Sequence, residues 1–112
     1  MTKELTNELR DLRDTLREFS AVRGWAKYHT PKNLAMALIV EAAELVEHFQ
    51  WATPEESRAL SLEKTAEVRD ELADVLIYLI ELADVLDIDL IAAARDKLAK
   101  NAIKYPPPGP GG

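Results

Sequence analysis

The sequence predicts an all-α protein, a four-helix bundle formed by a single domain over residues 1–105. Three observations lead to this fold class. Ala, Leu, Glu, Lys and Arg, which favour helices, dominate the 112 residues. Apolar residues recur at steps of three and four, as they do on one face of a helix. Glycine numbers only four, and five of the six prolines lie at residue 54 or beyond residue 105, so these helix breakers stand outside the periodic segments.

The first periodic segment predicts a helix over residues 6–22. Gly24 follows it as a stop, because glycine readily leaves the helical conformation. The apolar side chains of this segment form a stripe over roughly four turns, at alternating steps of four and three residues. They are Leu5, Leu9, Leu12, Leu16 and Phe19.

Two Thr-Pro pairs predict the next helix starts. Threonine is a good N-cap, and proline is well suited to the first helical position because that position needs no amide hydrogen. Thr30 and Pro31 therefore begin a helix over residues 31–51. Thr53 and Pro54 begin a short helix or turn, in which Glu56 completes a capping box with Thr53.

Two further helices are predicted over residues 62–86 and 90–104, the second capped within the turn Asp87–Asp89. Proline and glycine cannot continue the last helix, and we expect the tail of residues 106–112 to be disordered. The helix over 62–86 is apolar around more than half its circumference, so it must be covered on several sides. Its apolar residues include Leu72, Val75, Leu76, Leu79, Ile80, Ala83 and Leu86.

Charge and composition exclude several classes of partner and site. The formal net charge is −6, from 20 acidic and 14 basic residues, which argues against binding a nucleic acid polymer. No apolar stretch is long enough for a membrane span or a signal peptide. The chain has no cysteine, so it has neither disulfides nor a thiolate metal site, and we expect a cytoplasmic protein.

Two pairs of carboxylates form the candidate site. Glu41 and Glu44 lie in the helix over 31–51, and Glu71 and Asp74 lie in the helix over 62–86. Residues three apart share one helix face, and apolar residues flank both pairs. Four carboxylates brought together would repel one another, which a hard divalent cation relieves. Magnesium prefers oxygen ligands and is often shared between protein carboxylates and phosphates, so Mg²⁺ is the predicted cofactor.

Each pair has an ordinary structural interpretation as well. Either pair alone is more simply explained as solvated charges on a helix surface, and only their joint occurrence on apolar-flanked helices favours a metal site. The alternative function is a non-catalytic helical scaffold or oligomerisation module. In that case neutralising the carboxylates would leave every measurable property unchanged.

The residues around these acids resemble the MazG-like all-α NTP pyrophosphatase superfamily, and most closely its dCTP pyrophosphatase branch. The signature of that family is an ExxE motif followed by ExxD, which Glu41, Glu44, Glu71 and Asp74 fill. The resemblance covers residues 15–106. It extends to Arg23-Gly24-Trp25, His29, Pro31-Lys32-Asn33-Leu34, Phe49-Gln50-Trp51, Asp70 to Tyr78, Lys97, Asn101 and Lys104-Tyr105-Pro106. One departure is that Val40 and Ala43 stand where many relatives carry glycine.

The resemblance implies a magnesium-dependent enzyme that cuts a nucleoside triphosphate, dCTP or a modified dCTP, into the monophosphate and pyrophosphate as nucleotide-pool house-cleaning. Glu41, Glu44, Glu71 and Asp74 would be the catalytic metal ligands. It implies substrate contacts by three groups: Trp25, Trp51 and His29 at the base; Asn33 and Tyr78 elsewhere on the nucleotide; and Lys97, Asn101 and Lys104 at the phosphates. It does not identify the carboxylate that acts as base or the phosphorus that is attacked.

The supporting residues also have structural interpretations. A tryptophan at a helix end is commonly a packing residue, and the basic face of the last helix is commonly solvated. Trp25 and Trp51 flank opposite ends of one predicted helix, so a pocket that used both would need two subunits. A homodimer or homotetramer would also complete the core of so short a chain.

Overall fold

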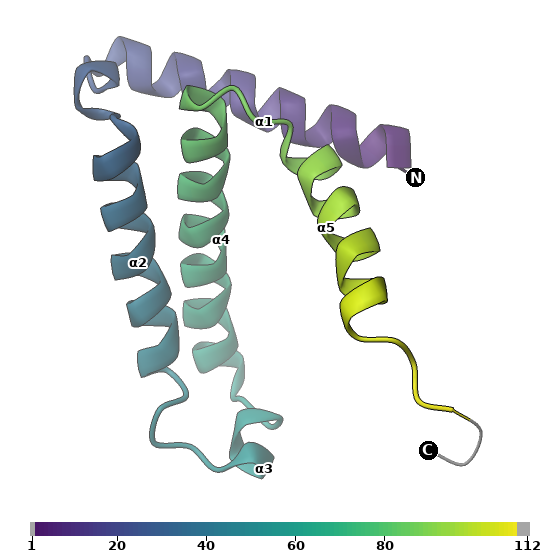
Figure 1. Cartoon of the computed structure of the whole chain (residues 1–112). Helices are drawn as coiled ribbons and strands as arrows, with labels where there is room; N and C mark the ends of the chain where they lie inside the picture. Colours follow the sequence, from purple (N-terminus) through teal and green to yellow (C-terminus); the bar gives the residue numbers. More distant parts are fainter. Residues whose placement is uncertain (1, 110–112) are drawn as a thin grey trace.

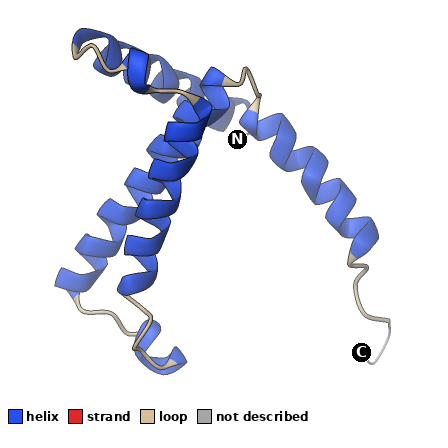
Figure 2. Ribbon diagram, turned by 60° about the vertical axis from the view of Figure 1, so that its left-hand side comes forward, coloured by secondary structure: helices blue, strands red, loops and turns tan. Residues whose placement is uncertain are grey.

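The computed structural model describes residues 2–109, with side chains from Asn7 onward, and this part of the chain contains helices but no strand (Figures 1 and 2). The predicted all-α class is therefore confirmed. The elements are α1 (Thr2–Val22), the 3₁₀ helix η1 (Ala26–Tyr28), α2 (Pro31–Glu47), α3 (Pro54–Ser57), α4 (Leu62–Val85) and α5 (Leu90–Lys104).

The predicted helix boundaries agree closely with the structure at most ends. The clearest exception is α2, which ends at Glu47 rather than at residue 51. Beyond it the amides of Phe49 and Gln50 both bond to the carbonyl of Val46, so the backbone tightens into turns. The chain must leave the helix before Pro54, because the residue preceding a proline avoids the helical conformation.

The caps predicted from sequence are present. The Thr30 hydroxyl accepts a hydrogen bond from the backbone amide of Asn33, and the Asp89 carboxylate accepts one from the backbone amide of Ala92. The hydroxyl of Thr53 accepts the amide of Glu56 at 3.1 Å while the Glu56 carboxylate accepts the amide of Thr53 at 2.9 Å, which is the predicted capping box. Gly24 has φ +67°, a backbone conformation that explains a glycine after α1.

The centre of the fold is an antiparallel hairpin of α2 and α4 (Figure 1). Leu34 of α2 and Val68, Ile80 and Ala83 of α4 are its buried apolar residues. At one end of the hairpin, Lys64 lies 3.3 Å from the Nδ1 atom of His48 and 3.2 Å from Glu67. The two helices are thus joined by apolar contacts along their length and by a polar cluster at this end.

Helix α1 crosses the opposite end of the hairpin (Figures 1 and 2). Arg17 of α1 donates from Nε to Asp84 of α4 at 2.8 Å, and its second guanidinium nitrogen bonds to the other oxygen of the same carboxylate. The Arg17 guanidinium holds the pKa of Asp84 below its usual range. This two-point ion pair fixes α1 across α4.

Helix α5 extends away from the hairpin, so one chain does not close the predicted four-helix bundle (Figures 1 and 2). Leu90 and Ile91, in its first turn, line a hollow of about 220 Å³ with Leu9 and Ile80, while residues 92–100 are exposed. The radius of gyration is 17.5 Å, against about 13 Å for a compact chain of this length. Asp87, which has φ +55°, lies in the connection between α4 and α5, and α5 diverges from the hairpin after this connection.

The C-terminal tail is only partly described. Pro106–Gly109 are exposed and have no regular secondary structure, and the rest of the expected disordered tail lies outside the described residues. Within residues 2–109, no helix combines the length and the apolar character that a membrane span requires.

We predict that Arg17→Met lowers the melting temperature at pH 7, because it leaves the half-buried Asp84 carboxylate without its partner. The folded-state pKa of Asp84 is depressed, so the ion pair stabilises above the ordinary pKa and loses this effect as the pH falls through the depressed value. The melting difference between wild type and variant should therefore shrink in acid. The exposed Arg10→Met on the same helix is the control. An equal difference at every pH would contradict the ion-pair explanation.

Candidate metal and substrate site

Three of the four predicted carboxylates meet between α2 and α4. Glu41, Glu44 and Glu71 each present an oxygen such that all three oxygens lie within 4.8 Å of one another. All three side chains are half-buried. Asp74 lies outside this closest group, yet its charge raises the pKa of both Glu41 and Glu71, so it belongs to the same electrostatic site.

The helix register produces this convergence. Glu41 and Glu44 are on the face of α2 that also carries Leu34, and this face packs on α4. Glu71 and Asp74 are three residues apart on α4, so they share one face as well. The apolar contacts of the hairpin hold the two helices together and thereby force the acids toward one another.

Two oxygens of the cluster are buried without a hydrogen-bond donor: the Oε2 atoms of Glu41 and Glu71. A buried acceptor that lacks a partner is costly, and a buried carboxylate is costlier still. The protein surroundings alone do not satisfy these atoms. A cation between the two helices would satisfy both.

Bringing the carboxylates together raises the pKa values of two of them. Burial and the neighbouring Glu44 and Asp74 carboxylates raise the pKa of Glu41 to about 7. Burial and the charge of Glu44 also raise the pKa of Glu71. Without a cation, the cluster therefore retains a proton at pH values where isolated carboxylates are fully ionised.

The donor set fits a hard divalent cation. Every candidate ligand is a carboxylate oxygen, and neither a thiolate nor an imidazole joins the group. Magnesium and similar ions prefer oxygen ligands, whereas zinc usually takes nitrogen or sulfur. Glu41, Glu44 and Glu71 would hold such an ion, with Asp74 close enough to take part.

Tyr78 lies one turn beyond Asp74 on α4. Burial and the charges of Glu41, Glu81 and Asp74 raise the pKa of its phenol, so the hydroxyl stays protonated near neutral pH. It can therefore donate a hydrogen bond to an oxygen of a ligand at the cluster. The predicted substrate contact by Tyr78 is compatible with this position and stays a prediction.

Trp25, Phe19 and Arg23 form an aromatic and basic group at the end of α1. Phe19 and Trp25 meet edge to face with ring centroids 5.6 Å apart, and the Arg23 guanidinium lies 3.4 Å from the centre of the Phe19 ring. Trp25 remains 44% exposed. A partly exposed ring with its orientation held by neighbours could stack on a base, although this contact also fits the packing role that tryptophans commonly have.

Asn33 has a structural task within the chain. Its side-chain amide donates to the carbonyl of Tyr28 at 2.9 Å, which fixes η1 against the start of α2. Its amide group is thereby partly engaged, and a direct substrate contact would have to use the remaining atoms. The half-buried His29 lies between these elements, near Glu81 of α4.

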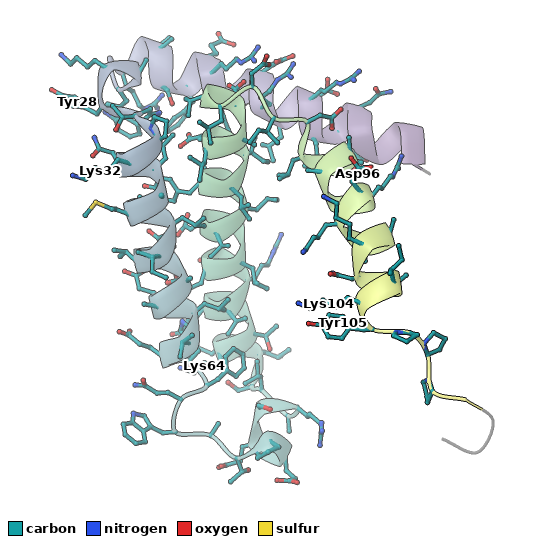
Figure 3. All side chains as sticks on the ribbon, viewed as in Figure 1. Tyr28, Lys32, Lys64, Asp96, Lys104 and Tyr105 are labelled. Carbon is teal, nitrogen blue, oxygen red and sulfur yellow. The ribbon has the colours of Figure 1, made fainter. Side chains whose placement is uncertain are left out.

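Trp51 and the α5 residues do not join the cluster in one chain. Trp51 is 89% exposed beyond the C-terminal end of α2, and the 17 residues of that helix, about 25 Å, separate it from the end at which Trp25 lies. Lys97, Asn101 and Lys104 are on α5, and Figure 3 shows Lys104 and Tyr105 on the helix that diverges from the hairpin. One chain therefore brings Glu41, Glu44 and Glu71 together, with Asp74 and Tyr78 nearby on α4. The predicted contacts Trp25, His29 and Asn33 lie in the segment from η1 to the start of α2.

Glu81 was absent from the sequence prediction. It follows Tyr78 by three residues on the same face of α4 and is half-buried, and burial raises its pKa. The signal that could have found it is the spacing from Asp74 to Tyr78 to Glu81, four residues and then three.

Comparison with known proteins gives three consistent results. Residues 36–109 match the model of the MazG-like family. The chain is 42% identical over 100 residues to dCTP pyrophosphatase 1 of Homo sapiens and, equally, to that of Bos taurus. These alignments cover 88% of this chain and 59% of each relative, so the chain spans about three fifths of the length of these curated proteins.

The fold is also shared with a solved structure. A pyrophosphatase from Archaeoglobus fulgidus superposes with a TM-score of 0.85 at 48% sequence identity. The match covers 89% of this chain and 94% of the archaeal one. The splayed arrangement of helices therefore matches a fold that has been seen in a crystal.

We predict that the stability of the metal-free protein falls as the pH rises from about 4.5 to about 7, the ordinary and the raised pKa of Glu41. In this interval the folded state holds more protons than the unfolded state, so deprotonation favours unfolding. Saturating Mg²⁺ should raise the melting temperature most at the upper end of the interval. Thermal melts with and without Mg²⁺ measure both effects.

The matched variants are Glu41→Gln in the cluster and Glu47→Gln, which is exposed on the same helix. Glu41→Gln should raise the melting temperature of the metal-free protein at pH 8 and weaken its response to Mg²⁺, whereas Glu47→Gln should behave as wild type. If both variants respond to Mg²⁺ as the wild type does, the cluster is not the metal site.

Proposed function

The chain belongs to the MazG-like family, and from this membership and its carboxylate cluster we propose that it is a magnesium-dependent nucleoside triphosphate pyrophosphohydrolase. The single observation that carries the proposal is the convergence of Glu41, Glu44 and Glu71 between α2 and α4, with two buried oxygens left without donors. The names of the relatives support the same reaction class.

The reaction adds water to a phosphorus of the triphosphate and breaks the bond between the α- and β-phosphates, giving a monophosphate and pyrophosphate. When bound, Mg²⁺ would neutralise charge between carboxylates and phosphates and polarise the phosphoryl group. A carboxylate of the cluster orients the water and accepts its proton. The Tyr78 hydroxyl donates a hydrogen bond to the bound nucleotide.

Our proposed substrate is dCTP or a modified dCTP, and the proposed role is removal of such nucleotides from the pool. The support is the 42% identity to two proteins named dCTP pyrophosphatase 1. A second source of support is the partly exposed Trp25 ring, which offers a surface for a base at the end of the hairpin.

We further propose that two or four copies assemble and that α5 of one copy completes the site of another. Helix α2 also carries four apolar side chains that are each more than half exposed: Met36, Ile39, Val40 and Val46. The chain exposes 8865 Å², against about 6,200 Å² for a compact monomer of its mass. An apolar face of this extent on a splayed chain favours burial against another copy.

We predict that the protein releases pyrophosphate from dCTP only with Mg²⁺, and that Glu41→Gln lowers kcat at least about 100-fold, because metal-assisted charge stabilisation is lost. The control Glu47→Gln should retain kcat. Pyrophosphate release from a panel of triphosphates measures this. Absence of release from every triphosphate, with melting and assembly unaffected by Glu41→Gln, would favour the helical scaffold function instead.

We predict that Glu41→Gln and Lys97→Met chains, each inactive alone, regain activity when refolded together. If α5 serves a neighbouring site, a dimer of one chain of each kind has one intact site, so an equal mixture recovers roughly a quarter of wild-type activity. Light scattering checks the assembly, and Ile39→Glu should reduce it to monomers while the exposed Lys32→Glu does not. Failure of the mixture to recover activity would mean that α5 serves its own chain.

A further inference from the structure

Two acids three residues apart on α4 have different environments. Asp84 is bound at both oxygens by Arg17 and fixes α1 to the hairpin. Glu81 is also half-buried, yet among the described residues it makes no hydrogen bond and no ion pair within contact distance. The structural role of Asp84 therefore does not explain Glu81.

The position of Glu81 is on the substrate side of the hairpin. It follows Asp74 by seven residues and Tyr78 by three, which places the three side chains along one face of α4. The charge of Glu81 raises the pKa of Tyr78, and the charge of His29 in turn acts on Glu81. Glu81 thus lies near Tyr78, on the face of α4 that carries the carboxylates, and near His29, in the loop before α2.

The spacing along α4 corresponds to the dimensions of a nucleotide. A rise of 1.5 Å per residue puts Glu81 about 10 Å beyond Asp74. Phosphates at the carboxylate cluster would leave the sugar near Tyr78 and the base near Glu81. Trp25, the partly exposed ring that could stack on a base, lies next to η1 at this same end of the hairpin, the end where Figure 3 labels Tyr28 and Lys32.

A carboxylate at this position has a specific recognition chemistry. It accepts hydrogen bonds and does not donate them, so it favours an exocyclic amino group and disfavours a carbonyl oxygen. Acidic side chains recognise the amino group of cytosine in this way. The oxygens of the half-buried Glu81 are not among the buried atoms without a partner, so water can reach them in the free protein and the amino group of a base would replace that water.

We propose that Glu81 is the specificity-determining residue of this site, where its carboxylate accepts a hydrogen bond from the exocyclic amino group of cytosine. It thereby selects dCTP over dUTP. This inference rests on the proposed function for the location of the phosphates. It adds a base-reading residue to the carboxylates and aromatic rings already described.

The test compares Glu81→Gln with wild type on dCTP and dUTP, with Glu63→Gln on the first turn of α4 as the control. The glutamine side chain can donate to the carbonyl of uracil as well as accept from cytosine. The dCTP-to-dUTP ratio of kcat/KM should fall roughly 10-fold or more in Glu81→Gln, as expected for loss of a hydrogen bond to a charged group. It should stay at the wild-type value in Glu63→Gln.

Other outcomes overturn the proposal. An unchanged ratio, or an equal loss with both substrates, would show that Glu81 does not read the base. A change in discrimination between CTP and dCTP alone would place the carboxylate at the sugar.

Titration calorimetry of dCMP and dUMP binding separates this inference from the proposed reaction, because binding needs no turnover. Preference for dCMP that depends on Glu81, without hydrolysis of any triphosphate, would overturn the proposed function and leave the inference standing. Hydrolysis of dCTP, with a dCTP-to-dUTP ratio of kcat/KM that Glu81→Gln leaves unchanged, would support the proposed function and overturn the inference. Neither turnover nor a preference for dCMP would overturn both.

Discussion

Repulsion among carboxylates held between two apolar helices is the constraint on which the rest of the structure depends. The hairpin of α2 and α4 has the buried Leu34 and Val68 in its two helices, and the packing of these helices brings Glu41, Glu44 and Glu71 within 4.8 Å of one another. The free energy of apolar burial therefore holds the acids in an arrangement that they would not adopt alone. A preorganised site of this kind would bind a cation without first rearranging the helices.

Helices α1 and α5 leave much of the hairpin surface exposed. Helix α1 closes one end through the Arg17–Asp84 ion pair, and the segment after it carries Trp25 and His29 toward the same end. Helix α5 is directed away and carries its basic residues with it (Figure 3). A single chain thus holds a negative site, and we propose that its partners are a metal ion and the basic residues of α5 from another copy.

The acidic residues of α4 have different neighbours, and their roles differ accordingly. Glu71 and Asp74 face α2 beside the other carboxylates, whereas Asp84 meets an arginine and serves the fold. Glu81 lies between these two situations, half-buried and near His29. Asp84 therefore anchors a helix, and we infer that the other acids of α4 serve metal binding at Glu71 and Asp74 and base recognition at Glu81, according to the neighbour that each faces.

Local features of the fold and of the candidate site could be predicted from the residues alone: helix periodicity, the caps at Thr30, Thr53 and Asp89, and the pairing of acids on shared faces. These depend on residues within one or two turns, which the sequence displays directly. Tertiary structure alone decided that α5 leaves the hairpin, that the Asn33 amide binds a carbonyl, and that Asp84 and Glu81 differ. Each of these depends on contacts between distant segments, whose geometry follows from packing and not from local spacing.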